Sequence, residues 1–154
     1  TTVTVGQTEH SFAKRFVWNN YNQIPTRLYT ADATADWTYA TSAWRVVNNN
    51  PANIIEFVSG LINPSIQVYA SIRVDNNNTA ILFAIGKNVT NAASGTSLVY
   101  GQDHGAASVS LMSNYTGIID AGYQYYSHVE YGVGGTPSMF ASSAYQSIFA
   151  EIMM

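Results

Sequence analysis

Few side chains in this sequence could carry chemistry near neutral pH. The chain has three histidines, together with nine aspartate and glutamate residues. Asp103 and His104 are adjacent in the stretch "YGQDHG", and such a pair can ligate a metal ion or act as an acid and a base. Neighbouring side chains of a strand point to opposite faces, so these two could reach one substrate only from a loop. A polar turn without chemistry is the alternative that we favour.

The other histidines and the motif search give no catalytic site. His128 lies in a predicted strand with Tyr126 and Glu130 on its own face, which indicates a core or interface residue rather than a ligand. His10, next to Glu9, is assigned no role. Cysteine is absent, nucleophile elbows, phosphate loops and zinc spacings are missing, and the scattered acids do not define a glycosidase pair. We therefore predict that the protein is not an enzyme and needs no cofactor.

One acidic turn could hold a cation. The stretch "DNNN" at residues 75–78 offers carboxylate, amide and carbonyl oxygens, which are the ligands that calcium prefers. It contains a single acid, and Asp and Asn are also the residues that form hairpin turns. We therefore predict a hairpin turn and no metal site.

Aromatic side chains mixed with amides give a better argument for binding. The stretches "WNNY" at 18–21 and "DWTYATSAW" at 36–44 have the composition that stacks on sugar rings and hydrogen-bonds to their hydroxyls. In the alternative interpretation, Trp18 and Trp44 belong to the core. The residues predicted to contact a receptor or glycan are Trp18, Tyr21, Trp37, Tyr39, Asp103 and His104.

Short alternating segments must position these side chains. The stretch "SIQVYASIRV" at 65–74 places apolar residues on one face and mainly polar ones on the other, as in a half-buried strand. No segment keeps a helical period for three turns, so we expect only a short helical turn near 32–37. Many short strands predict an all-β, antiparallel β-sandwich of the jelly-roll type, forming a single domain over residues 1–154. Further strands are predicted at 13–18, 44–47, 53–59, 80–85, 107–112, 115–119, 122–131 and 144–153.

The composition excludes two classes of partner. Charged residues make up 10% of the chain, against about 25% in ordinary soluble domains. Such a neutral surface suits a protein in an assembly or outside the cell, with an ordinary neutral domain as the alternative. Six scattered lysine and arginine residues offer no footprint for nucleic acid. The longest apolar runs, at 80–86 and 117–122, are too short to span a membrane.

Four segments in order resemble the trimeric jelly-roll family of the C1q and tumour necrosis factor globular domains. They are "IIEFVSGLINPSIQVYASIRV", "ILFAIGKNV", "SVSLMSNYTGIIDAGYQYYSHVEYG" and "AYQSIFAEIMM". The resemblance covers residues 44–154 and lies in the order of strands rather than in invariant residues. Two turns depart from the family pattern, because Lys-Asn-Val stands at 87–89 in place of Lys-Asn-Gly, and Asp-Ala-Gly at 120–122 in place of Gly-Asp.

The resemblance implies a homotrimer packed along aromatic-rich strands. The residues it places at the trimer interface are Tyr123, Tyr125, Tyr131 and Phe149. The amide-rich, charge-poor sequence is most similar to members that form virus and bacteriophage spikes and fibre heads. The resemblance therefore implies a structural protein at the virion surface, with other virion proteins and a host receptor or glycan as partners.

Two other classes fit the same sequence. A capsid or decoration protein would need no ligand site, and a secreted lectin would bind sugar as an isolated trimer. The chain begins at Thr1 without a basic segment followed by an apolar one. We therefore expect that a leader has been removed or that the chain is the C-terminal head of a longer protein.

Overall fold

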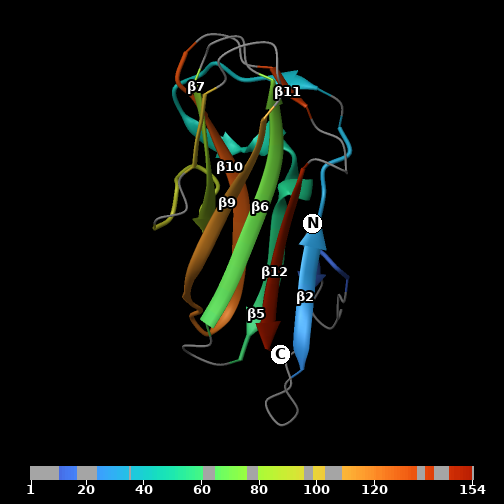
Figure 1. The fold of residues 1–154 in the computed structure, drawn as a ribbon. Helices are drawn as coiled ribbons and strands as arrows, with labels where there is room; N and C mark the ends of the chain where they lie inside the picture. The colour runs from blue at the N-terminus through green and yellow to red at the C-terminus, as the bar shows by residue number, and fades with distance from the viewer. Residues whose placement is uncertain are drawn as a thin grey trace.

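The computed structural model shows a chain built almost entirely of β-strands (Figure 1). It describes residues 11–16, 24–34, 36–60, 65–75, 80–95, 99–102, 109–134, 138–140 and 146–153. None of these residues belongs to a helix that could cross a membrane. The elements are β1 (Lys14–Arg15), β2 (Pro25–Thr30), β3 (Trp37–Thr38), β4 (Trp44–Val46), the 3-10 turns η1 (Val47–Asn49) and η2 (Pro51–Asn53), β5 (Ile54–Ser59), β6 (Ser65–Asp75), β7 (Ala80–Lys87), β8 (Val99–Gln102), β9 (Val109–Ile118), β10 (Gly122–Gly132), β11 (Ser138–Phe140) and β12 (Ser147–Met153).

The strands form two sheets that pack face to face. The first sheet has the order β1-β5-β10-β7-β8, and β4 also pairs with β10. The second has the order β2-β12-β6-β11-β3, and β9 pairs with the other edge of β6. Figure 1 shows β9, β6, β12 and β2 lying in front of β5, β10 and β7. All described pairings are antiparallel except that of β1 with β5, so the predicted antiparallel sandwich is confirmed.

Alternation along the strands creates the core between the sheets. In β6, Ile66, Val68, Ala70 and Ile72 are buried while the residues between them are not, as the pattern at 65–74 predicts. Burial of these apolar side chains stabilises the fold by roughly 25 cal/mol for each Å² removed from water. The main cluster contains Leu28, Ile55, Phe57, Ile66, Val68, Ala70, Ile85, Ile119, Tyr126, Ile148, Ala150 and Ile152. A second cluster contains Val47, Ile72, Val74, Ile81 and Phe83.

Polar side chains in the interior hold the two 3-10 turns. The Asn53 amide donates to Asp32 Oδ2 at 3.2 Å and to the Val47 carbonyl at 2.9 Å, and Gln146 Nε2 donates to Asn53 Oδ1 at 2.7 Å. Burial raises the pKa of Asp32, but hydrogen bonds from Thr34 and the two asparagine amides outweigh it, so the pKa lies below its ordinary value. These bonds compensate the cost of burying polar groups, and they tie the residues after β2 to the start of β12.

Three expectations about the strands are wrong or incomplete. The expected helical turn near 32–37 does not form, since Trp37 begins β3. The segments predicted separately at 107–112 and 115–119 contribute to one strand, β9, over their described residues 109–118, because Ser113 and Asn114 pair with β6 despite their preference for turns. Strands β2, β3, β8 and β11 were not predicted, since none carries a long alternating apolar pattern.

Candidate functional site

No strand of the described residues covers the outer side of the second sheet. In β2, β12, β6 and β9, alternate residues point into the core, so the remaining residues form a continuous outer surface, which we call the open face. It carries three large apolar side chains that are strongly exposed, Met112, Ile118 and Met153. Its other described residues in these strands are Pro25, Arg27, Tyr29, Ser65, Gln67, Tyr69, Ser71, Arg73, Ser110, Asn114, Thr116, Ser147, Phe149 and Glu151.

Three aromatic rings cross the open face at one level of the sheet. The strand register places Tyr29 opposite Phe149 and Phe149 opposite Tyr69. The Phe149 and Tyr69 rings are stacked with centroids 5.1 Å apart, and the Arg27 guanidinium lies 5.2 Å from the Phe149 centroid and 5.7 Å from that of Tyr29. Such stacking and cation–π contacts hold the side chains in place. We call Tyr29, Phe149 and Tyr69 the aromatic row.

The polar groups beside the aromatic row are paired within the sheet. The Tyr69 hydroxyl donates to Gln67 Oε1 at 2.8 Å, and the hydroxyls of Ser71 and Ser147 lie 3.1 Å apart. An ordered aromatic and apolar surface with few charges has the composition of a protein interface rather than of a reaction centre. The open face is therefore suited to contact with another protein surface.

The four predicted interface residues do not share one face. Phe149 lies in the aromatic row, whereas Tyr123, Tyr125 and Tyr131 alternate with the core residue Tyr126 and so point outward from the first sheet. Tyr123 donates its hydroxyl proton to Glu56 Oε1, and burial together with this carboxylate raises its pKa. If one face mediates assembly, Phe149 and the three tyrosines belong to different surfaces.

Two of the predicted ligand-binding residues lie together, in contact with a buried acid. The Trp37 indole donates to Glu130 Oε2 at 3.0 Å, and Arg45 pairs with Glu130 Oε1 at 2.7 Å while its guanidinium lies 3.8 Å from the Tyr39 ring centroid. The Tyr39 hydroxyl donates to the Ala43 carbonyl. These polar atoms are used inside the protein, so the cluster holds β3 and β4 against β10. The other predicted residues, Trp18, Tyr21, Asp103 and His104, lie outside the described residues.

The burial of Glu130 and His128 affects their protonation in different ways. Burial raises the pKa of Glu130, against the opposing effects of Trp37, Arg45 and the Asn48 backbone N–H. Burial lowers the pKa of His128 to about 3, and neither of its ring nitrogens has a hydrogen-bond partner. His128 is therefore a neutral core residue, as its place in the strand predicts. Within the part of the chain that the structure describes, no three acidic or histidine side chains cluster to hold a metal ion.

Sequence reasoning missed Tyr29, Tyr69 and Arg27 as surface residues of interest. Tyr69 occupies an outward position of the strand predicted at 65–74, but nothing in the pattern indicates which rings flank it. Its neighbours come from residues 40 and 80 positions away, so only the order of strands in the second sheet brings the row together.

Comparison with known proteins shows the class of fold. No family model matches the sequence. No curated protein matches it. A solved structure of Eiger TNF from S. frugiperda is similar, with a TM-score of 0.54 over 86% of this chain and 93% of that chain, at 9% sequence identity. The protein therefore has a jelly-roll fold of the tumour necrosis factor type, as the resemblance implies, while its assembly and partners stay predictions.

Proposed function

We propose that the protein is a homotrimeric head domain that presents a ligand-binding surface outside the cell. The aromatic row on the open face carries this proposal. It is an ordered group of rings on a side of the sandwich that none of the described strands covers, and burying it against another copy of the chain would remove a large apolar area from water. A closed ring of identical copies buries the same surface on each copy.

The proposed number of copies rests on the resemblance of the chain to a trimeric family. The C1q and tumour necrosis factor jelly rolls are trimeric, and the chain resembles them in its order of segments. The outward side of the first sheet is a poorer candidate for the interface. Residues 88–95 fold back over part of it, with Ser127 Oγ donating to the Val89 carbonyl at 2.6 Å and Ser94 N–H donating to the Ile85 carbonyl at 2.9 Å.

Two matched variants test the interface. Phe149→Asp removes the central ring of the aromatic row and places a carboxylate in the proposed interface, where burial of a charge is unfavourable. Tyr125→Asp places the same charge on the outward side of the first sheet. Native mass at micromolar concentration should show a trimer for the wild type and for Tyr125→Asp, and a monomer for Phe149→Asp. Loss of the trimer only in Tyr125→Asp would assign assembly to the other face, and a monomeric wild type would end the proposal.

We further propose that this head belongs to a virus or bacteriophage particle, as part of a spike or fibre that contacts a host receptor or glycan. The support is the composition, because asparagine, threonine, serine and tyrosine supply the surface polarity in a chain with 10% charged residues. Antibodies raised against the folded trimer should label the surface of intact particles and block their attachment to cells. Purified particles that carry no such epitope would contradict this role.

A further inference from the structure

A short segment closes one edge of the sandwich between the two sheets. Residues 11–15 place β1 beside β5 of the first sheet, where Glu56 N–H donates to the Ala13 carbonyl at 2.9 Å. On the other side, Tyr29 N–H of β2 donates to the Phe12 carbonyl. The backbone of Phe12 is therefore fixed between the sheets, although its side chain is 75% exposed. A large apolar ring held in solvent at a fixed place suggests contact with something outside the chain.

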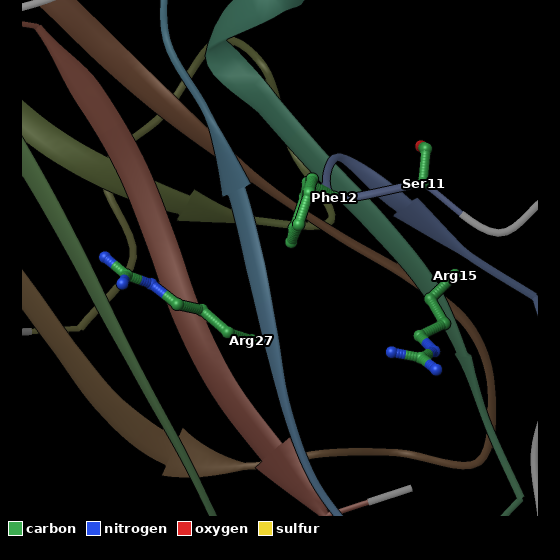
Figure 2. A pocket seen from close by; sticks show the side chains of 4 residues that line it. All are labelled: Ser11, Phe12, Arg15 and Arg27. Carbon is green, nitrogen blue, oxygen red and sulfur yellow. The ribbon is translucent and has the colours of Figure 1, made fainter.

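Two adjoining hollows, of about 440 and 170 Å³, lie beside this segment and share Phe12 and Arg27. Figure 2 shows Arg15 turned toward β2, and Phe12 standing next to that strand. Arg27 lines the hollows from β2 and extends across β12, where its guanidinium lies over Phe149. We call this region the arginine hollow; its described lining residues are Ser11, Phe12, Arg15, Arg27 and Tyr29.

The cations of the arginine hollow differ from three other described cations in their partners. Lys14 pairs with Glu56, Arg45 with Glu130 at 2.7 Å, and Lys87 with Asp120 at 2.8 Å. Among the described residues, no carboxylate lies within ion-pair distance of Arg15 or Arg27. In a protein whose net charge is −3, these two guanidinium groups thus flank β2, with Arg15 on the side of β1 and Arg27 on the side of β12.

The Arg27 guanidinium is not used by the acid that is paired with it in the sheet. Glu151 is opposite Arg27 in the β2–β12 ladder, but the two form no ion pair. The guanidinium lies over the rings of Phe149 and Tyr29 instead, and a stacked guanidinium keeps its in-plane N–H donors free for an acceptor. The edge of the sandwich therefore offers cationic donors next to aromatic walls.

We propose that the arginine hollow binds a sugar that carries a carboxylate. An arginine fork donates two parallel hydrogen bonds to a carboxylate, and Arg15 is the residue turned into the hollow. The exposed ring of Phe12 gives the apolar face of a pyranose a surface on which to pack. The larger hollow, of about 440 Å³, has the volume of a small-ligand site, and the adjoining hollow of about 170 Å³, which Arg15 lines, would take the carboxylate. Sialic and uronic acids supply the required chemistry.

This inference deepens the proposed function, because it rests on the ligand-binding half of that proposal. Arg15 and Phe12 belong to the closing segment beside β2, whereas the interface proposal concerns the aromatic row on the outer side of the second sheet. The larger hollow borders that row, because Arg27 and Tyr29 also line it, so sugar binding and native mass are measured on the same samples. Sugar binding and assembly are therefore separate measurements, and failure of one leaves the other to be judged by itself.

The test titrates the full chain with methyl glycosides and follows amide and indole signals by NMR. The methyl glycosides of N-acetylneuraminic acid and of glucuronic acid are the acidic probes, methyl galactoside is the neutral control, and acetate controls for the carboxylate alone. We expect saturable shifts with at least one acidic probe, and affinities at least about tenfold lower for the neutral sugar and for acetate. Binding should weaken as salt is raised.

Two variants locate the site. Arg15→Gln should reduce the affinity for the acidic probe by about tenfold or more. Lys14→Gln removes the same charge from the neighbouring residue, which pairs with Glu56, and should change the affinity less than twofold. Phe12→Ala serves as a second probe because its exposed side chain contributes little to folding, and it should weaken binding of the sugar but not of acetate.

Several outcomes would overturn the inference. Equal binding of neutral and acidic sugars would remove the role of the carboxylate, and equal binding of acetate would remove that of the sugar ring. A folded wild type that binds no probe, or an Arg15→Gln variant with unchanged affinity, would remove the site. Native mass measured on the same samples reports the trimer independently, so a monomer that binds the acidic sugar would contradict the proposed assembly alone.

Discussion

The two sheets of this sandwich are built from similar alternating strands, yet their outward sides differ. The first sheet is partly covered by its own chain, because residues 88–95 fold back over Gly86 and Ser127. The second sheet carries the aromatic row and exposed methionines with no covering segment among the described residues. The difference shows that alternation determines which side chains leave the core, whereas the connections between strands determine whether they meet solvent, the chain itself or a partner.

The largest expected effect concerns the open face. Phe149→Asp should weaken self-association by about 3–5 kcal/mol, since it removes the central ring of the aromatic row and buries a carboxylate in the proposed interface. Sedimentation equilibrium over a range of concentrations would measure this change. Tyr125→Asp on the first sheet is the matched control, and equal weakening by both variants would contradict the distinction between the two faces.

The packing of residues 88–95 against the first sheet can be tested by adding a methyl group at Gly86. A Cβ added at Gly86 would lie 2.5 Å from the Val89 carbonyl oxygen and 2.8 Å from Ser127 Oγ. Gly86→Ala should therefore lower the free energy of unfolding by about 1–3 kcal/mol through overpacking, measured by urea denaturation. Thr90→Ala, at an exposed position of the same segment, should stay within about 0.5 kcal/mol of the wild type. An unchanged Gly86→Ala protein would mean that the segment does not pack against the sheet.

Acid should lower the stability of the protein because His128 is buried in the core between the two sheets. Because its pKa is about 3 in the folded protein and about 6.5 in the unfolded chain, only the unfolded chain binds a proton between these values. The contribution of neutral His128 to the free energy of unfolding is therefore retained above pH 6.5 and is lost progressively as the pH falls below that value. Lowering the pH from 7 to 5 should cost about 2 kcal/mol, measured by urea denaturation at each pH.

The control for acid sensitivity is His128→Leu, which removes the titrating group. Glu130 has a raised pKa and acts in the opposite direction, so the difference between wild type and variant isolates the histidine. An equally steep loss of stability in the variant would assign the acid sensitivity to other groups.

The smallest expected effect lies on the outward side of the first sheet. Tyr123→Phe removes the hydroxyl that donates to Glu56, while Lys14 keeps its own pair with that carboxylate. Because Tyr123 is 51% exposed, we expect a loss of only about 0.5 kcal/mol and no change in native mass. Dissociation of the trimer in this variant would move the interface to the first sheet.

The strands were predictable where their pattern was long. Strands β6 and β10 each run over eleven residues, and both were predicted. Strand β2 was missed because its six residues include a proline and a buried threonine, and β9 was divided because Ser113 and Asn114 favour turns. In both cases pairing with a neighbouring strand decides the conformation, and a single sequence does not state that pairing.

The candidate site was predictable only in part. Phe149 was predicted at a trimer interface together with Tyr123, Tyr125 and Tyr131, and the structure places it in a different sheet from these three tyrosines. Contact of Trp37 and Tyr39 with a receptor or glycan stays a prediction, while the structure shows that the Trp37 indole donates to Glu130 and the Tyr39 hydroxyl to the Ala43 carbonyl. A residue type can indicate what a side chain is able to bind, but its actual partner depends on which strands are neighbours.

The sequence by itself determined the fold class, since alternation with a period of two and frequent turn residues leave few architectures open to a chain of this length. It also determined which side of β6 faces the core. Only the tertiary structure decided that Tyr29, Phe149 and Tyr69 share one level of the second sheet and that Arg15 and Arg27 lie at one edge. The physical reason is that periodicity is local, whereas the pairing of strands depends on contacts between residues far apart in the chain.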